Sequence, residues 1–210
     1  MSGSIRTKVC GLTDPEDAKA VIDAGVDLAG INFVPTSKRV VDLRTAEAIC
    51  RVLEDSGVER VALFQNQPWD EIERVLRRVE FERVQLHGEE TEEEVELVEL
   101  PVIKALPGAD LEAAMMFPGS MLLVDHPHAG GGQGETWDWS GAAELIEAGL
   151  DVILAGGLNP ANVEAAIEAV GDIPPWGIDV ATGVEGDGTR KSPEKIRALV
   201  AAVRRAGSAD

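Results

Sequence analysis

The sequence has no long apolar run, and this shortage excludes a membrane-spanning protein. Its 210 residues contain no stretch near the roughly 18 consecutive apolar residues that cross a bilayer. The chain opens on Met1-Ser2-Gly3-Ser4 and passes directly into a predicted strand, without the apolar segment of a secretory signal. We therefore expect a soluble, cytoplasmic protein with a single domain over residues 1–210, since no linker or low-complexity segment divides it.

Cysteine is also scarce, so the fold does not depend on a disulfide framework. Of the two cysteines, Cys50 lies on the apolar side of a helical pattern and is expected to be a small core residue. A bond between Cys10 and Cys50 is not expected in a reducing cytosol.

Positive charge is the third shortage. The chain has 38 acidic and 19 basic residues, for a net charge of −19, and only six of the basic residues are lysines. Such a field repels nucleic acid and anionic membranes, so neither is an expected partner. An acidic, lysine-poor surface suits molar salt, where the Debye length falls to about 3 Å, and we expect a halophilic source. The alternative is an acidic protein from an ordinary environment, and unfolding at low salt distinguishes the two.

What the sequence does contain is a pattern repeated eight times, in which a short β-branched run precedes a stretch of helical periodicity. The predicted strands are residues 5–10, 27–33, 60–65, 83–87, 102–106, 121–125, 151–155 and 176–180. The predicted helices are residues 14–24, 44–55, 69–79, 91–98, 110–116, 140–148, 160–170 and 193–205. This alternation predicts a parallel sheet, and eight units favour a closed (β/α)8 TIM barrel of the α/β class over an open sheet.

Cys10 and Asp125 stand where the first and sixth predicted strands end. In a parallel barrel the carboxyl ends of all strands meet at one face, where active sites are built. A thiol and a carboxylate at that face can supply a base and an acid to one small substrate. Lys8 shares the face of Cys10 by the two-residue period of a strand, where it favours the thiolate, and Asp179 on the eighth strand can pair with Lys8. Each residue alone has a simpler interpretation, Cys10 as a buried barrel residue and Asp125 as a cap.

Two glycine-containing loops follow the seventh and eighth strands, and both contain candidate phosphate ligands. In such barrels these loops and a short helix commonly bind phosphate through backbone N–H groups, which suits a chain of net negative charge. The candidates are Gly156, Gly157, Thr182 and Gly183. A lone Gly-Gly pair is usually a turn, but two such loops at this pair of strands indicate a site.

Three further groups have both a functional and a simpler interpretation. The sixth loop, residues 125–134, is glycine-rich and could fold over a ligand or be a flexible surface loop. Its His126 and His128 lack a clear further ligand, so no metal is expected. Arg39, in the second loop, can grip a carboxylate with two hydrogen bonds or lie in solvent. His87, at the end of the fourth strand, lines the site or bonds a neighbouring loop.

Taken together and in order, these segments resemble the phosphoribosylanthranilate isomerase family of tryptophan biosynthesis. The matching segments cover nearly the whole chain: residues 8–13, 33–40 with Ser37 and Arg39, 84–88, 122–125, 131–134 with 137–139, 155–158 and 179–185. Small departures from the family pattern are Ala181 in place of a common serine, Gln133 in the sixth loop and Gln65 before Asn66.

The resemblance implies a barrel enzyme, an aldose–ketose isomerase, that performs an Amadori rearrangement without metal or cofactor. N-(5-phosphoribosyl)anthranilate becomes 1-(2-carboxyphenylamino)-1-deoxyribulose 5-phosphate. By this resemblance Asp125 is the general acid, Cys10 is the general base, and Arg39 holds the anthranilate carboxylate. The remaining substrate-binding residues that it implies are Gly132, Gly134, Gly156, Gly157, Asp179, Thr182 and Gly183. The partner is then the small phosphosugar–anthranilate substrate, and the protein is a monomer or homodimer.

Three alternatives remain at this stage. An acidic protein that binds a partner through its surface charge would leave the residues at the strand ends unexplained. Another phosphosugar isomerase or epimerase would share the seventh and eighth loops. Such enzymes use paired aspartates or a metal, whereas here the first strand ends in Cys10 and the fifth in Lys104-Ala105-Leu106. A non-catalytic phosphosugar-binding module would keep Gly156, Gly157 and Gly183 but would need neither Cys10 nor Asp125. Activity distinguishes these alternatives from the isomerase.

Overall fold

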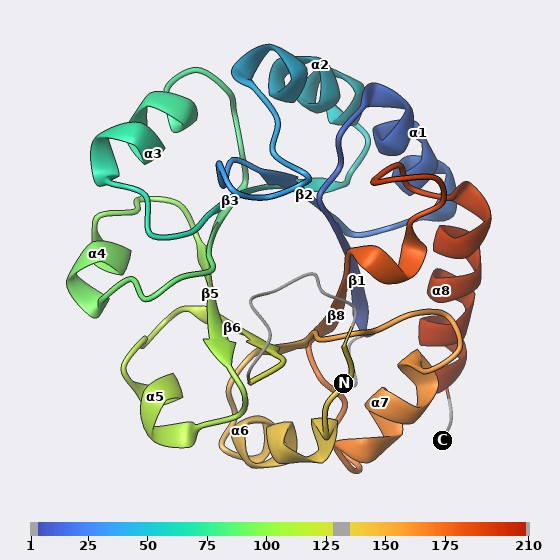
Figure 1. Ribbon diagram of the computed structural model, residues 1–210. Coiled ribbons are helices and arrows are strands. Elements are labelled where there is room, and N and C mark those ends of the chain that lie inside the picture. Colours follow the sequence, from blue (N-terminus) through green and yellow to red (C-terminus); the bar gives the residue numbers. More distant parts are fainter. Residues whose placement is uncertain (1–3, 128–134, 209–210) are drawn as a thin grey trace.

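Strands and helices alternate along the chain in the computed structural model, which describes residues 4–127 and 135–208 (Figure 1). The strands are β1 (Arg6–Cys10), β2 (Leu28–Asn32), β3 (Glu59–Phe64), β4 (Arg83–Leu86), β5 (Val102–Pro107), β6 (Met121–Asp125), β7 (Val152–Leu154) and β8 (Gly177–Val180). The α-helices are α1 (Pro15–Ala24), α2 (Leu43–Leu53), α3 (Trp69–Leu76), α4 (Glu92–Glu96), α5 (Leu111–Met115), α6 (Ala143–Glu147), α7 (Val163–Ala169) and α8 (Pro193–Ala206). Two 3₁₀ helices, η1 (Trp139–Ala142) and η2 (Thr182–Val184), complete the described elements.

The strands form a closed parallel barrel in chain order, with the helices in a ring around it (Figure 1). β1 pairs with both β2 and β8, so the sheet has no free edge. The predicted (β/α)8 barrel is therefore confirmed. Each strand lies within two residues of its predicted bounds.

The helix starts follow local hydrogen bonding that the sequence encodes. Asp14 caps α1 by accepting from the amide of Glu16, and Thr91 and Glu94 form a capping box at α4. One departure from the predicted helices is near residue 140, where the first turn is the 3₁₀ helix η1 and the α-helix begins only at Ala143. The predicted helix 160–170 begins instead at Val163, because the Asn162 side chain binds back to the preceding loop.

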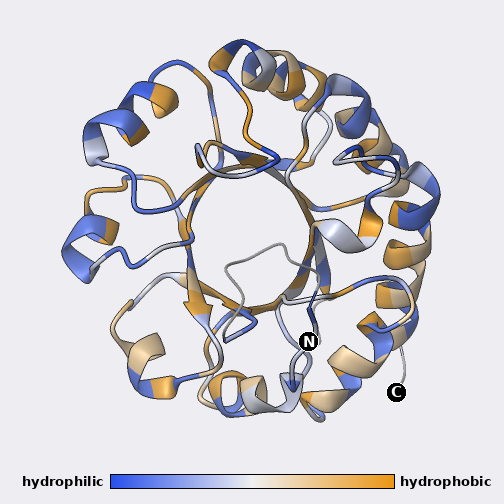
Figure 2. Ribbon diagram, viewed as in Figure 1, coloured by the Kyte–Doolittle hydropathy of each residue, from blue (hydrophilic) through white to orange (hydrophobic). Residues whose placement is uncertain are grey.

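Two apolar cores hold the barrel together. The larger lies between the strands and the helices, and Figure 2 shows apolar residues along the strands and on parts of the helices. The smaller lies inside the barrel and consists of Leu28, Val61, Ile103, Ala105, Met121, Leu123, Ile153 and Ala155, with Trp176 packed against it. Because strand side chains alternate between the two sides, β2, β3, β5, β6 and β7 contribute residues to both cores.

Polar side chains replace apolar ones toward the carboxyl ends of the strands. Lys8, Asn32, Gln85 and Asp125 are buried there although each is polar or charged. Burying such groups is unfavourable unless they find partners, so their gathering at one end of the barrel locates the candidate site. None of the described helices is long and apolar enough to cross a membrane.

Candidate active site

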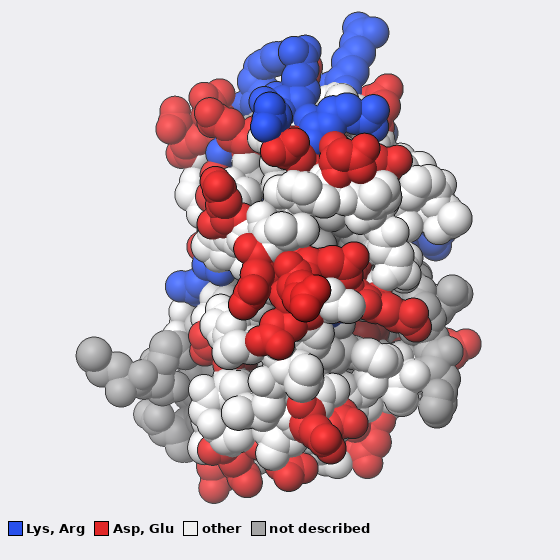
Figure 3. Space-filling view, turned by 90° about the vertical axis from the view of Figure 1, so that its left-hand side faces the viewer, with Lys and Arg blue, Asp and Glu red and all other residues white. Residues whose placement is uncertain are grey.

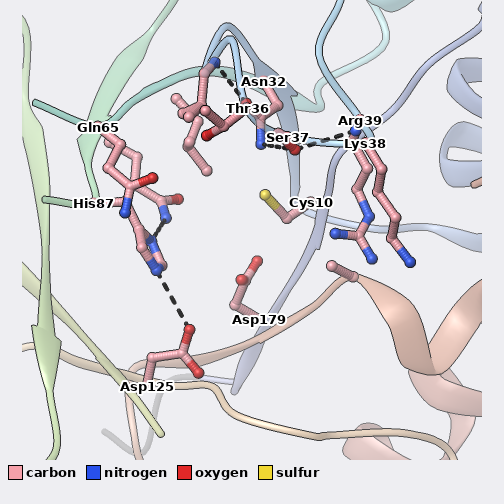
Figure 4. A pocket seen from close by; sticks show the side chains of 14 residues that line it. Cys10, Asn32, Thr36, Ser37, Lys38, Arg39, Gln65, His87, Asp125 and Asp179 are labelled. Carbon is pink, nitrogen blue, oxygen red and sulfur yellow. Dashed lines mark hydrogen bonds and ion pairs between the residues drawn. The ribbon is translucent and has the colours of Figure 1, made fainter. Parts of the chain in front are cut away.

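Cys10 and Asp125 face a common cavity of about 460 Å³ at the carboxyl ends of the strands (Figure 4). Both residues are buried, and the cavity also contacts Arg39, His87 and Asp179. The structure thus brings together five residues that the sequence singled out, from β1, β6, β8 and the segments that follow β2 and β4. The pairing of Cys10 with Asp125 across one cavity is the geometry that an acid and a base acting on one ligand require.

The Cys10 thiol occupies space that a glycine leaves open on the next strand. Gly30 is the register partner of Cys10, and a Cβ added to it would lie 2.9 Å from the Cys10 sulfur. Burial raises the pKa of the Cys10 thiol, while the positive charge of Lys8 lowers it by a smaller amount. The expected influence of Lys8 is therefore present, but the net direction is opposite to the lowered pKa that a base requires, because burial penalises the thiolate more strongly.

Lys8 and Asp179 form a buried ion pair beside the thiol, as the strand pattern predicts. Their Nζ and Oδ1 atoms are 2.8 Å apart, and the two residues are register partners on β1 and β8. Burial acts against the ammonium charge, but the interactions with Asp179 and Cys10 together outweigh it, and the pKa of Lys8 is raised. Lys8 is therefore a buried positive charge two residues before Cys10.

Asp125 is held by groups from two directions. Its Oδ1 accepts a hydrogen bond from the backbone N–H of His126 at 2.8 Å, and its Oδ2 lies 3.4 Å from Nε2 of His87. The other ring nitrogen of His87 lies 2.8 Å from Nε2 of Gln85. Of the two interpretations of His87, the structure shows the one in which it lines the site.

Arg39 lines the cavity, but its guanidinium is already engaged by the loop after β8. Its Nε donates to Glu185 at 2.5 Å and its Nη2 donates to the Thr182 hydroxyl at 2.7 Å. Gly11 makes room for this side chain, because a Cβ there would lie 2.3 Å from Arg39 Cδ. From the sequence, Arg39 was expected either to bind a ligand carboxylate or to lie in solvent. Its ion pair with Glu185 was not predicted.

Glu185 forms ion pairs with three basic residues on this side of the cavity, Lys38, Arg39 and Lys191. Burial would raise the pKa of its carboxyl group, but the hydrogen bond from Arg39 and the charges of Lys191, Arg39 and Lys38 outweigh burial and lower it. Lys191 is fully enclosed, and burial lowers its pKa despite the nearby Glu185. Because three cations surround one carboxylate, this part of the site carries an excess of positive charge, although the net charge of the protein is −19.

The loops after β7 and β8 touch one another beside this cavity. A Cβ on Gly183 would lie 2.0 Å from the carbonyl oxygen of Leu158, and one on Gly157 would lie 2.4 Å from the carbonyl oxygen of Glu135. Gly156 and Gly157 both have positive φ, at 83° and 66°. Close packing therefore requires a glycine at these positions. Gly132, Gly134 and His128 lie outside the described residues.

Several polar residues of the site were missed from the sequence. Asn32 ends β2, where its amide donates to Ser37 and accepts from the Val34 N–H, and so shapes the loop that carries Arg39. Gln65, directly after β3, and Gln85, in β4, also line the cavity. The sequence feature that could have identified them is a polar residue on the inward-facing side of a strand, near the end of that strand.

A second buried ion pair holds the segment behind His87. Lys104 Nζ lies 2.9 Å from Glu90, whose carboxylate also accepts from the backbone N–H groups of Asn66 and Gly88. In the described part of the chain, no group of three or more His, Cys, Asp or Glu side chains is arranged to hold a metal ion.

The chain is similar in sequence and in structure to known proteins. The family described as N-(5'phosphoribosyl)anthranilate (PRA) isomerase matches residues 7–202. An N-(5'-phosphoribosyl)anthranilate isomerase from Myxococcus xanthus is 41% identical over 209 residues, covering 96% of this chain and 97% of that one. The structure of phosphoribosyl anthranilate isomerase from Thermus thermophilus superposes with a TM-score of 0.86 at 36% identity, over 96% of this chain and 99% of the other. A phosphoribosyl anthranilate isomerase in complex with reduced 1-(o-carboxyphenylamino)-1-deoxyribulose 5-phosphate has a TM-score of 0.83 at 32% identity, over the same shares.

Proposed function

The chain belongs to the N-(5'-phosphoribosyl)anthranilate isomerase family, and on that premise we propose that Cys10 and Asp125 divide the acid and base steps of the reaction. The activity is the isomerisation of N-(5-phosphoribosyl)anthranilate to 1-(2-carboxyphenylamino)-1-deoxyribulose 5-phosphate in tryptophan biosynthesis. The observation that carries the division of roles is that a thiol from β1 and a carboxyl group from β6 face one cavity.

Asp125 begins the reaction as the general acid. Its proton passes to the furanose ring oxygen, the C1–O bond of the sugar breaks, and the nitrogen lone pair forms an iminium at C1. Cys10 then acts as a thiolate and removes the proton at C2, and the C–H electron pair forms the enolamine. Tautomerisation of the enolamine to the ketone completes the rearrangement, with a proton gained at C1 and one lost from the C2 hydroxyl.

The buried thiol becomes a base because positive charge develops beside it. Burial raises the pKa of Cys10, and Lys8 offsets that rise only in part. The iminium formed when the ring opens is a second cation next to the sulfur and favours the thiolate further. This order of events makes the thiolate form of Cys10 most favoured after Asp125 has acted.

The rest of the site binds the two ends of the substrate. Arg39, held by Glu185, meets the anthranilate carboxylate with its positive charge. Gly156, Gly157, Thr182 and Gly183 bind the phosphate through backbone N–H groups. Asp179 accepts hydrogen bonds from sugar hydroxyls while remaining paired to Lys8.

The experiment that tests these roles is a fluorescence assay of phosphoribosylanthranilate consumption. Cys10→Ala and Asp125→Asn are each expected to fold normally and to lose at least about 100-fold in kcat, since each removes an acid or base group. Arg39→Ala is expected to act mainly on KM. Near-full activity of Cys10→Ala would show that the base is a different residue.

We also propose that the protein is adapted to high salt. Figure 3 shows acidic side chains spread over one face of the molecule, with basic ones gathered at one edge. At a net charge of −19, repulsion between surface charges destabilises the folded state until salt screens it. Thermal unfolding in about 0.1 M and about 2 M KCl is expected to give a higher Tm at high salt, where the Debye length is only about 3 Å or less. An equal or lower Tm would contradict the adaptation.

A further inference from the structure

A chain of three polar side chains crosses the cavity wall and ends on Asp125. Nε2 of Gln85 lies 2.8 Å from Nδ1 of His87, and Nε2 of His87 lies 3.4 Å from Oδ2 of Asp125 (Figure 4). Gln85 and His87 are two residues apart at the end of β4, so both point to the inside of the barrel.

The contacts at the two ring nitrogens favour the same position for the proton of His87, on the nitrogen that faces Asp125. An amide nitrogen only donates, so Nδ1 must accept, and the neutral imidazole then has its proton on Nε2, facing Asp125. Turning the amide over would place its oxygen at Nδ1 and require a proton there. His87 would then face Asp125 with an unprotonated Nε2. The lone pair of this nitrogen would repel an ionised Asp125 carboxylate, or would accept the proton of a neutral one.

The observed orientation of Gln85 leaves a polar atom without a partner. Among the described residues, Oε1 of Gln85 is the buried side-chain oxygen or nitrogen that has no hydrogen-bond partner. Gln85 is 1% exposed, so solvent does not compensate for the missing bond. An apolar residue of similar size would fill the space without this penalty, but it would not set the proton of His87.

We propose, on the premise that Asp125 is the general acid, that His87 is a positioning residue for it and that Gln85 fixes the tautomer of His87. As Asp125 gives up its proton, negative charge develops on the carboxyl group. An N–H donor binds an ionised carboxylate about twice as strongly as a neutral acceptor, so the contact from His87 strengthens as the transition state forms. The distance of 3.4 Å between Nε2 of His87 and Oδ2 of Asp125 is expected to shorten as that charge grows. The His126 N–H already holds Oδ1, which leaves Oδ2 as the atom that His87 stabilises.

The activity test compares two substitutions of His87 by amide side chains of different length. In His87→Gln the side-chain nitrogen occupies the place of Nε2 and still donates to Asp125, whereas in His87→Asn it occupies the place of Nδ1 and does not. We expect His87→Asn to lose about 10- to 100-fold in kcat, with KM changed by less than about 3-fold, since the lost bond acts in the transition state. We expect His87→Gln to stay within about 5-fold of the wild type. Equal losses in the two variants, or a loss confined to KM, would overturn the proposal.

A spectroscopic test needs no activity. The ¹⁵N shifts of the imidazole nitrogens distinguish an Nε2–H from an Nδ1–H ring, and the His87 signals are identified by their disappearance in His87→Asn. The wild-type protein is expected to show the Nε2–H tautomer. Gln85→Glu, whose carboxylate only accepts, is expected to move the proton to Nδ1 and to lower kcat as His87→Asn does. An Nδ1–H ring in the wild type would overturn the proposal even if Gln85→Glu does not fold.

Asp125→Asn separates this proposal from the one it depends on. If Asp125→Asn remains active, the acid is misassigned and His87 has no acid to position. If Asp125→Asn is inactive and His87→Asn is fully active, Asp125 keeps its role and only the role of His87 is refuted.

Discussion

Replacing Lys8 by methionine tests whether the buried ion pair supports both the barrel and the thiol. Lys8 is 1% exposed, and its Nζ lies 2.8 Å from Oδ1 of Asp179. At that distance, with an effective dielectric constant of 20, the Coulomb attraction is about 6 kcal/mol, and removing one partner of a buried pair costs about 3–5 kcal/mol because the other charge stays buried. We therefore expect Lys8→Met to lower the free energy of unfolding by about 3–5 kcal/mol.

The same change should alter catalysis through Cys10. Without Lys8 the pKa of the thiol rises further, so less thiolate is present at neutral pH. We expect kcat at pH 7 to fall at least about 10-fold and to recover as the pH is raised, because the thiolate fraction then increases.

Urea unfolding followed by tryptophan fluorescence gives the stability, with Lys19→Met as the control because Lys19 is exposed on α1. The control is expected to change stability by less than about 0.5 kcal/mol. Adding Asp179→Asn to Lys8→Met removes the unpaired charge, and the double mutant cycle should give a coupling energy of about 2–3 kcal/mol. A Lys8→Met protein that loses less than about 1 kcal/mol and keeps its activity would refute the reasoning.

Two further predictions follow from the packing around the site. Gly30→Ala places a Cβ 2.9 Å from the Cys10 sulfur, so we expect it to lower the free energy of unfolding by about 1–3 kcal/mol and kcat by at least about 10-fold. The control is Gly141→Ala, whose Cβ would have an ordinary 3.6 Å contact, and it should be nearly neutral in both assays. Glu90→Gln removes a buried carboxylate whose pKa burial would raise but whose hydrogen bonds and pairing with Lys104 lower below 4.5. Its stabilisation is therefore present above about pH 4.5 and lost as the pH falls through the lowered value, so the variant should be about 3–5 kcal/mol less stable at pH 7 and should lose less further stability in acid. Unfolding curves between about pH 3 and pH 7 check this, and parallel curves for the variant and the wild type would contradict it.

The barrel could be predicted from the sequence because the patterns that specify its strands, helices and caps are periodic and involve residues close together in the chain. Apolar runs that alternate with helical stretches, and caps such as Thr91 with Glu94, specify elements one at a time. The positions of Cys10, Asp125 and Asp179 at strand ends then place them together, since the strands are parallel and in chain order. The pairing of Lys8 with Asp179 follows from the same logic, because β8 closes against β1.

What the sequence did not predict depends on contacts between distant segments. The anchoring of Arg39 by Glu185 joins residues 146 positions apart, and no local pattern encodes it. The raised pKa of Cys10 is a matter of burial depth, which strand periodicity does not measure. The link between Gln85 and His87 was available in principle, because both face inward at one strand end, but its partner Asp125 comes from another strand. The late start of α6 reflects packing of the segment before it, where Trp137 and Trp139 both donate to the Ala155 carbonyl.

The central claim is that Cys10 removes the C2 proton of the substrate after Asp125 has opened the ring. Single-turnover consumption of phosphoribosylanthranilate, with hydrogen or deuterium at C2, measures that step without product release. We predict a primary isotope effect in the wild type and a loss of at least about 100-fold in rate for both Cys10→Ala and Asp125→Asn. A Cys10→Ala enzyme that consumes substrate at the wild-type rate, with the same isotope effect, would contradict the account.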